Sequence, residues 1–332
     1  MKDELVVVTG AGGFIAGALV ADLRRQGYKK IRAVDIKPLN QWYQVFEDVE
    51  NLRLDLKEKE NCENAARGAY EIYNLAADMG GMGFIETHKA ECMLSVLINT
   101  HMLMAANKYG VQRYFFSSSA CVYNADKQRD PNNPGLKEVD AYPALAEDGY
   151  GWEKLFSERM CRHFREDYGL RTRVARFHNV YGPFGTWDGG REKAPAAICR
   201  KVIEAKIKGK NEIVIWGTGQ QTRSFMYIDD CITGIHLIMN SDIEEPINLG
   251  SSEMVSINQL VDIVEDIAGV KLNRAYDLSA PKGVNGRNSD NTLIKKYLNW
   301  EPSTPLRAGL EKTYAWILEQ YLARESGRKV VA

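Results

Sequence analysis

The feature that most constrains the fold is a glycine-rich segment that directly follows a short apolar run near the start of the chain. Leu5-Val6-Val7-Val8 has the pattern of a buried strand, and Thr9-Gly10-Ala11-Gly12-Gly13-Phe14-Ile15-Ala16 leads from it into apolar residues at helical spacing. In such a strand–turn–helix unit the glycines let the backbone approach a pyrophosphate, and the helix N-terminus supplies amide donors. The segment therefore predicts a dinucleotide-binding unit. The residues expected around the dinucleotide are Gly10, Gly12, Gly13, Phe14 and Ile15.

The next predicted strands carry further candidates for dinucleotide contacts. The strand at residues 31–34 ends in Asp35. An acid about 20 residues beyond the glycine motif accepts a hydrogen bond from the adenosine 2′-hydroxyl and repels a 2′-phosphate, so we expect NAD rather than NADP. The alternative is an ordinary solvated acid at a strand end. A third strand, 52–56, contains Asp55, which we expect at the adenine edge. A fourth strand, 71–77, ends in residues over which the dinucleotide would pass, Leu75, Ala76 and Ala77.

Strands and helices alternate through the first half of the chain, and this alternation predicts an α/β fold with a Rossmann-type, doubly wound parallel sheet. After residue 179 the alternation breaks down, and Gly and Pro punctuate a long loop. We therefore expect an NAD-binding domain and a smaller α/β substrate-binding lobe. The expected bounds are 1–178 with a return segment near 225–242 for the domain, 179–224 and 243–322 for the lobe, and 323–332 for a flexible tail.

The charge balance argues against nucleic acid or a membrane surface as a partner. The chain has 43 Lys plus Arg and 44 Asp plus Glu residues, so its formal net charge is −1. No apolar run reaches the ~18 residues of a membrane-spanning helix, and no signal-peptide pattern precedes the first strand. The six cysteines are scattered without a Cys-x-x-Cys pair, which is typical of reduced thiols rather than of disulfides or a metal site. We expect a cytoplasmic protein with a small-molecule substrate and no metal.

Residues suited to acid–base chemistry gather in the middle of the chain. Ser117-Ser118-Ser119-Ala120-Cys121 follows the apolar run of a fifth strand, and Tyr150-Gly151-Trp152-Glu153-Lys154 lies downstream. A Tyr and a Lys four residues apart share one helix face, so the ammonium can favour the phenolate and let it act as a base near neutral pH. Such a pair is also common by chance. The glycine motif earlier in the chain is what favours the catalytic interpretation.

The order and spacing of these motifs resemble a known family. The glycine motif, Asn74-Leu75-Ala76-Ala77, the serine cluster and the Tyr-Lys pair together resemble an extended short-chain dehydrogenase/reductase of the NAD-dependent epimerase/dehydratase family, and the resemblance covers essentially the whole chain. Longer blocks are more specific and resemble the family of GDP-mannose 3,5-epimerases. These blocks are Ala76 to Ile85, Ser118 to Cys121, Arg176 to Asn179, Tyr181 to Trp187, Gly189 to Ala197, Gln221 to Ser224 and Gly286 to Asn291.

This resemblance implies an NAD-dependent epimerisation of GDP-mannose. Transient oxidation at C4 would acidify the hydrogens on C3 and C5, and inversion of both centres gives GDP-L-galactose, or GDP-L-gulose when C5 alone inverts. By the same resemblance Tyr150 takes the C4 hydroxyl proton, Lys154 holds the nicotinamide ribose and Ser119 bonds the C4 oxygen. Cys121 and Lys193 match the two epimerisation residues, with the lysine as acid and the thiol as base if a nearby cation lowers its pKa. Outside this context Cys121 would be interpreted as a buried structural thiol.

A GDP group also needs cations for its pyrophosphate, and Arg side chains suit that geometry. By their match to the family's substrate motifs, Arg223 and Arg287 are the expected pyrophosphate ligands, with Lys201 in support and Asn179 near the sugar phosphate. The full set expected to contact the substrate is Gly80, Gly81, Ser119, Ala120, Cys121, Asn179, Glu192, Lys193, Ala194, Lys201, Gln221, Arg223, Ser224 and Arg287. Gly149 stands where the family often has Ala, and we expect it to loosen the turn before the catalytic tyrosine.

Other functions stay open. Another NAD-dependent nucleotide-sugar enzyme, a 4-epimerase, a dehydratase or a decarboxylase, is one alternative. A 4-epimerase would not require both Cys121 and Lys193, and a dehydratase should have an acid at position 121. A non-catalytic NAD-binding regulator is a second alternative, although it would more plausibly have lost Tyr150 or Lys154. Members of the superfamily often dimerise through two helices beside the Tyr-Lys pair. A homodimer through residues 93–109 and 152–168 is therefore expected.

Overall fold

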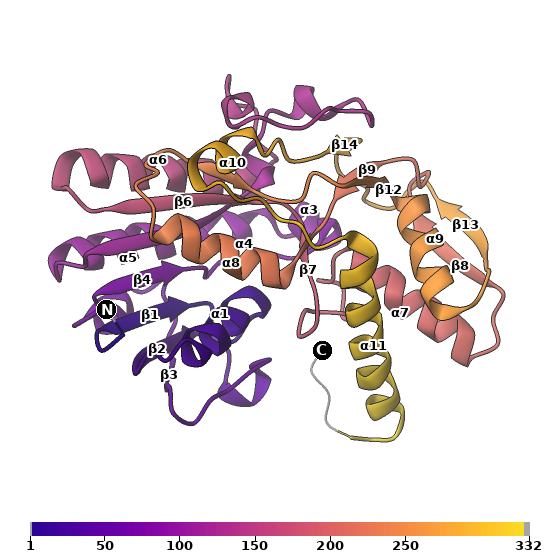
Figure 1. Cartoon of the computed structure of the whole chain (residues 1–332), viewed down its shortest axis with the longest axis horizontal. Helices are drawn as coiled ribbons and strands as arrows, with labels where there is room; N and C mark the ends of the chain where they lie inside the picture. Colours follow the sequence, from indigo (N-terminus) through magenta and orange to yellow (C-terminus); the bar gives the residue numbers. More distant parts are fainter. Residues whose placement is uncertain (1, 329–332) are drawn as a thin grey trace.

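One parallel sheet of seven strands forms the centre of the fold. The computed structural model describes residues 2–328. The strands lie in the order β11-β6-β5-β4-β1-β2-β3, every neighbouring pair is parallel, and Figure 1 shows them side by side from β3 to β6. This arrangement confirms the predicted Rossmann-type, doubly wound sheet. The strand bounds are Leu5–Thr9 (β1), Lys30–Asp35 (β2), Glu50–Arg53 (β3), Glu71–Asn74 (β4), Arg113–Ser119 (β5), Thr172–Phe177 (β6) and Ile247–Leu249 (β11).

Helices cover both faces of this sheet, which explains why the first strand is apolar from Leu5 to Val8. Successive side chains of a strand point to opposite faces. Val6 and Val8 therefore enter the core beneath α1 and α8, whereas Val7 enters the core beneath α2, α5 and α6. The helix bounds are Phe14–Arg25 (α1) and Ile228–Met239 (α8) on one face, and Lys59–Ala66 (α2), Ser95–Lys108 (α5) and Tyr150–Tyr168 (α6) on the other.

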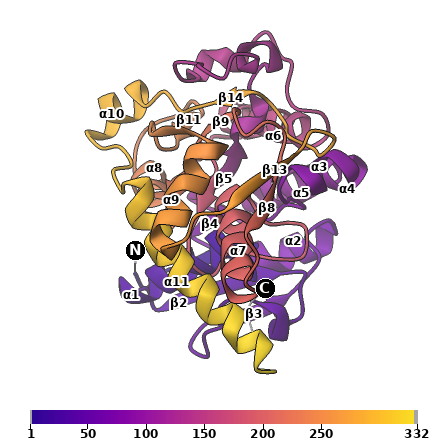
Figure 2. The ribbon, with the colours of Figure 1, turned by 90° about the vertical axis from the view of Figure 1, so that its right-hand side faces the viewer.

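A second lobe lies beyond the carboxyl ends of the strands in Figure 1. It is built around three helices that pack on one another, as Figure 2 shows. These helices are α7 (Ala194–Ile207), α9 (Ile257–Ala268) and α11 (Leu306–Glu325). Small sheets complete the lobe and its junction with the first domain: β8 (Glu212–Trp216) with β13 (Asn273–Asp277), β9 (Thr222–Ser224) with β12 (Met254–Ser256) and β14 (Gly286–Arg287), and β7 (Val180–Tyr181) with β10 (Met226–Tyr227). The shorter helices are α3 (Met82–Thr87), α4 (Lys89–Met93) and α10 (Thr292–Leu298).

Local signals at its two ends explain where α9 begins and ends. The Ser256 hydroxyl accepts a hydrogen bond from the Gln259 amide at 3.1 Å, and the Gln259 side chain accepts one from the Ser256 amide at 2.8 Å. Gly269 ends the helix with a φ of 65°, a left-handed conformation that glycine adopts at little cost. Helix α9 therefore spans Ile257–Ala268.

Three expected boundaries need correction. Strand β3 ends at Arg53, so Asp55 lies in the turn that follows it. The return segment extends beyond residue 242, because β11 pairs with β6 and buries Ile247 and Leu249 in the central sheet. Helix α11 continues to residue 325, since Arg324 lies over the ring of Trp187 and pairs with Asp188 at 2.6 Å. Residues 329–332 of the expected tail lie outside the described residues. Within residues 2–328, none of the helices combines the length and the apolar character needed to cross a membrane.

Candidate active site

The glycine loop lies where β1 ends, beside the end of β4. Gly10 has a φ of 74°, and a Cβ there would lie 3.1 Å from the backbone of Ala76, so the two segments approach as closely as glycine allows. The Gly12 amide donates to Asp35 at 2.9 Å, which places this carboxylate at the mouth of the loop. An NAD molecule fits across the carboxyl edge of the sheet, next to the N-terminus of α1, the glycine loop and the acid at the end of β2.

The junction between β1 and β4 is fixed by buried polar contacts. The Thr9 hydroxyl donates to Asn74 at 2.7 Å and accepts from the amides of Leu75 and Ala76 at 3.1 and 3.2 Å. Leu75 and Ala76 are therefore held against the glycine loop. Asp55 follows β3, two strands from β1 in the sheet, and accepts a hydrogen bond from the Lys57 amide at 2.9 Å. Trp42, which the sequence did not single out, packs its indole directly against Gly12.

The Tyr-Lys pair lies in the first turns of helix α6, which packs beside strand β5. The Lys154 ammonium lies 5.5 Å from the centroid of the Tyr150 ring and pairs with Glu153 at 3.4 Å, and both members of that ion pair are buried. Ser119, the last residue of β5, accepts the Cys121 amide at 3.2 Å and so starts the turn that carries the thiol. Burial, followed by the charges of Cys121 and Glu153, raises the pKa of Tyr150 well above its usual range, so the phenol is protonated in the cofactor-free protein.

Cys121 lies against a guanidinium from the second lobe. Arg287 on β14 donates to the Cys121 sulfur at 3.4 Å, to Gln128 at 2.6 Å and to Glu147 at 3.0 Å. Burial and then the Glu147 carboxylate raise the pKa of the thiol to about 11, and Arg287 only partly opposes them. The condition for Cys121 to act as a base, a pKa lowered by a nearby cation, is therefore not met in the cofactor-free protein: the cation is present, but desolvation and an adjacent carboxylate outweigh it.

A second guanidinium and an ammonium complete this cluster. Strands β9 and β14 pair in parallel with Arg223 opposite Arg287, so the sheet register itself sets the two cations side by side. Arg223 donates to three backbone carbonyls, and within residues 2–328 no carboxylate lies within ion-pair distance of it. Burial and the charge of Arg287 lower its pKa to about 9. Lys193 occupies the N-cap position of α7, and burial likewise lowers its pKa.

Paired, buried like charges are unfavourable unless an anion binds between them. The structure thus brings Ser119, Cys121, Tyr150, Lys193, Arg223 and Arg287 to one region between the lobes, and the cation pair on β9 and β14 has the chemistry of an anion site.

The other predicted substrate residues divide into two groups. Some line the same junction: the Asn179 side chain donates to the Ser224 carbonyl at 3.0 Å, and the Gln221 side chain donates to Trp216. The Gly81 amide donates to the Arg191 carbonyl at 3.0 Å, so the Gly80-Gly81 loop lies against the segment before α7. Ala120 and Ala194 lie next to Cys121 and Lys193 in the chain, and Ala120 is buried.

Two charged members are engaged elsewhere. Glu192 accepts from Arg200 at 3.0 Å, and Lys201 donates to the Val214 carbonyl of β8 at 2.7 Å with its ammonium 5.8 Å from the Trp216 ring. The sequence missed Glu147 and Gln128, which no local motif marks. A signal was available for Trp216 in its position directly before the Gly-rich segment at 217–219.

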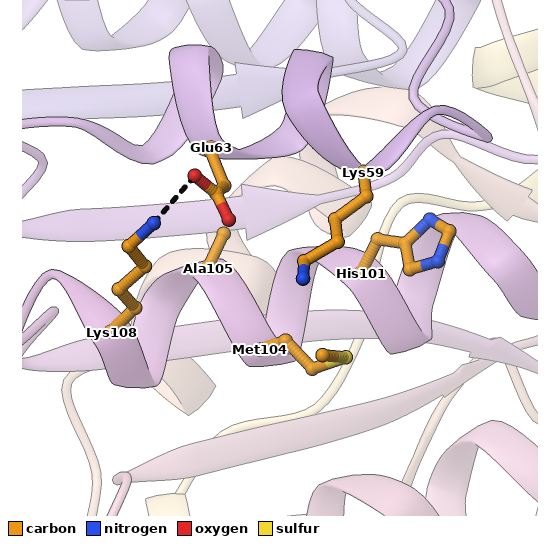
Figure 3. Close-up of a pocket in the computed structure, with 6 residues that line it drawn as sticks. All are labelled: Lys59, Glu63, His101, Met104, Ala105 and Lys108. Atoms are coloured by element: carbon orange, nitrogen blue, oxygen red, sulfur yellow. Dashed lines mark hydrogen bonds and ion pairs between the residues drawn. The ribbon is translucent and has the colours of Figure 1, made fainter.

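A surface pocket between α2 and α5 lies apart from this cluster (Figure 3). It is lined by Lys59, Glu63, His101, Met104, Ala105 and Lys108, and Lys108 donates to Glu63 at 2.6 Å. None of its side chains belongs to the predicted site. We therefore take the region around Cys121 and Tyr150 as the candidate active site.

Comparison with known proteins places the chain in a family. Residues 6–250 match the model of the NAD dependent epimerase/dehydratase family. GDP-mannose 3,5-epimerase from Arabidopsis thaliana is 45% identical over 316 residues, which cover 95% of this chain and 82% of that protein. A GDP-mannose 3,5-epimerase from Oryza sativa subsp. japonica has the same identity and coverage.

Among solved structures, UDP-glucose 4-epimerase from Thermotoga maritima has a TM-score of 0.84 with 24% identity and covers 96% of this chain and 99% of its own. MoeE5 in complex with UDP-glucuronic acid and NAD has a TM-score of 0.77 with 28% identity, over 95% of this chain and 99% of its own. A family model that matches most of the chain, together with a relative of 45% identity along almost all of it, supports one conclusion. The chain belongs to the NAD-dependent epimerase/dehydratase family.

Proposed function

We propose that the protein epimerises GDP-mannose at C3 and C5 to give GDP-L-galactose, and that it gives GDP-L-gulose when only C5 inverts. One observation carries this proposal. A buried thiol, Cys121, accepts a hydrogen bond from one of two paired arginines, interacts electrostatically with the partly buried Lys193, and packs in one cluster with Tyr150 of the Tyr-x-x-x-Lys pair. The plant relatives at 45% identity are named for the same reaction. A dehydratase should have an acid at position 121, where this chain has Cys121.

In this mechanism the Tyr-Lys pair serves the oxidation step. When bound, NAD supplies a reversible hydride acceptor for C4. Tyr150 takes the proton of the C4 hydroxyl, Ser119 holds the C4 oxygen, and Lys154 binds the nicotinamide ribose. Because burial opposes ionisation of the phenol, the positive charge of Lys154 is needed to stabilise its anion. The resulting C4 ketone acidifies the neighbouring hydrogens on C3 and C5.

The second pair inverts those centres. One residue removes a proton from the carbon beside the ketone, and the other returns a proton to the opposite face. In the cofactor-free protein burial lowers the pKa of Lys193, which favours a neutral amine as proton acceptor, whereas the pKa of Cys121 is raised to about 11, which favours a thiol as proton donor. These two directions support Lys193 as the base and Cys121 as the acid in the cofactor-free protein, whereas the resemblance implies the reverse order.

The remaining roles concern binding. We propose that Arg223 and Arg287 hold the pyrophosphate, because their paired charges lie side by side and only one has a carboxylate partner. Asn179 lies near the sugar phosphate in this proposal, and Lys201 with Trp216 contacts the nucleoside. NAD lies against residues 10–15, Asp35, Asp55 and residues 75–77. The cofactor domain then comprises residues 1–178 and a return through β11, and the rest of the described chain forms the substrate lobe.

The direct test is incubation of the purified protein with GDP-mannose in deuterated water, followed by proton NMR without added cofactor. Deuterium at both C3 and C5, together with accumulation of GDP-L-galactose, is the expected result. Incorporation reports the ketone route because those hydrogens exchange only when C4 is oxidised. The absence of incorporation, even with NAD supplied, would contradict the proposed substrate and leave the fold and the family unchanged.

We also propose a cytoplasmic homodimer that pairs through α5 and α6. The outer surfaces of these helices and the turn before α5 expose large apolar side chains, among them Leu94 (47%), Trp152 (40%) and Phe156 (50%). Light scattering should give twice the mass of one chain. Phe156→Glu should yield monomer, whereas the control Leu322→Glu, at an exposed position on α11, should leave the dimer intact. A monomeric parent protein at micromolar concentration would contradict the proposal.

A further inference from the structure

Glu147 is absent from the set of site residues predicted from the sequence, yet it closes the contacts around Cys121. Its carboxylate accepts from Arg287 at 3.0 Å, and the same guanidinium donates to the Cys121 sulfur at 3.4 Å. The Glu147 amide also donates to the Cys121 carbonyl at 2.9 Å. Glu147 is therefore fixed to Cys121 through the backbone and, through Arg287, by its side chain. The side chains of Glu147 and Arg287 are only 16% and 6% exposed.

One oxygen of this carboxylate has no visible donor. Oε2 accepts from Arg287, whereas Oε1 is buried, and no group within residues 2–328 donates a hydrogen bond to it. A buried carboxylate oxygen without a donor is costly. The Cys121 thiol faces this carboxylate, and a thiol can supply a proton that a thiolate cannot.

The other charges around the thiol are positive. Arg287 on β14, Arg223 on β9 and Lys193 at the start of α7 all face Cys121, and each would favour a thiolate. Tyr150 on α6 is neutral, and Glu86 on α3 faces Glu147 with a pKa raised by burial and by the charge of Glu147. Glu147 is thus the carboxylate that offsets the cations next to the sulfur.

We propose that Glu147 is a positioning residue of this site, one that holds the Arg287 guanidinium against Cys121 and keeps Cys121 in its thiol form in the resting protein. Gln128 completes the arrangement by accepting from the third nitrogen of Arg287 at 2.6 Å. The inference deepens the proposed function, on which it rests only for the use of that thiol as a proton donor.

Glu147→Gln provides the test because it removes the charge and retains the shape of the side chain. Arg287 then faces the sulfur without compensation, and an opposite charge at this distance lowers a pKa by about 1 to 3 units. We expect the midpoint of the Cys121 titration to fall by about one pH unit, measured as ultraviolet thiolate absorbance of the substrate-free protein. Subtraction of the matching Cys121→Ala protein removes the signal of the other residues. Glu147→Ala is a second charge-removing variant with the same expected shift.

Two controls separate this effect from a merely structural one. Asp148→Asn removes the same charge one residue away, where the side chain is 75% exposed and paired with Lys89, and should leave the midpoint unchanged. Glu147→Asp retains the charge and should keep the midpoint near that of the parent protein. An unchanged midpoint in Glu147→Gln, or an equal shift in Asp148→Asn, would overturn the proposal.

The titration needs no nucleotide sugar, so the two proposals fail separately. If the midpoint shifts while the parent protein shows no deuterium incorporation, the role of Glu147 stands and the proposed reaction falls. If the parent protein incorporates deuterium, the pH optimum of that exchange should move to lower pH in Glu147→Gln. Exchange by the parent protein with no shift in either profile would remove Glu147 from the mechanism and leave the reaction in place.

Discussion

Tyr150→Phe is expected to abolish turnover of GDP-mannose and all deuterium exchange at C3 and C5. The variant keeps the aromatic ring, which is buried in a small apolar cluster with Phe84, Ile85 and Cys92, and loses only the hydroxyl that we propose takes the C4 proton. Without oxidation at C4 neither neighbouring hydrogen becomes acidic, so both inversions stop together. General base catalysis contributes typically ~10²–10⁴-fold, and we expect a loss in this range or beyond.

Proton NMR in deuterated water measures this loss directly. Tyr168→Phe is the matched control, because it removes a hydroxyl from the same helix at a position that is 61% exposed, and its exchange rate should equal that of the parent protein. Retained NAD, released by denaturation and quantified, would show that the Phe variant still holds its cofactor. Exchange at C3 or C5 in Tyr150→Phe at a rate near that of the parent protein would exclude Tyr150 as the base.

Cys121→Ser should separate oxidation from inversion. Tyr150, Lys154 and Ser119 are untouched, so C4 is still oxidised, and reduced nicotinamide should be detectable by its absorbance after GDP-mannose is added. A serine hydroxyl is a far poorer participant in proton transfer than a thiol, so inversion should fall by ~10²-fold or more. Arg287 can donate to the hydroxyl as it does to the sulfur, and we expect the variant to fold.

Cys92→Ser is the control for this experiment. Cys92 packs in the same apolar cluster as Cys121 and Tyr150, but within residues 2–328 Cys121 is the cysteine that receives a hydrogen bond from Arg287. Cys92→Ser should preserve deuterium exchange at both C3 and C5. Melting temperatures of both variants would show whether each one is folded. Inversion by Cys121→Ser at the rate of the parent protein would remove the thiol from the mechanism. If the variant lost both inversion and C4 oxidation, the substitution would have disturbed the Tyr-Lys pair.

Most of the fold that could be predicted follows from local patterns in the sequence. The buried strand before Gly10 is visible in the sequence because the spacing of apolar residues reports backbone conformation directly. Gly149 shows the limit of such reasoning. Its φ of 76° and ψ of −93° show that it fixes an unusual turn before Tyr150 rather than loosening it, and a Cβ there would lie 3.1 Å from Lys89.

The candidate site was predicted in part from the same local signals. The positions of Tyr150 and Lys154 follow from helical spacing, and the place of Cys121 follows from the end of β5. The direction of the pKa shift at Cys121 did not follow, because it depends on how deeply the thiol is buried and on a carboxylate that no motif marks. Sequence reasoning identified Arg287 as a cation of the site and missed the carboxylate of Glu147 beside it.

The sequence by itself determined the order of strands and helices, the glycine loop for a dinucleotide and the Tyr-Lys pair, since each depends on residues within one or two turns of the chain. Only the tertiary structure decided that Arg223 lies opposite Arg287 and that Arg287 joins Cys121 to Glu147. Arg287 lies 166 positions along the chain from Cys121 and 140 from Glu147. Contacts over such separations depend on the path of the whole backbone, which periodicity and end signals do not encode.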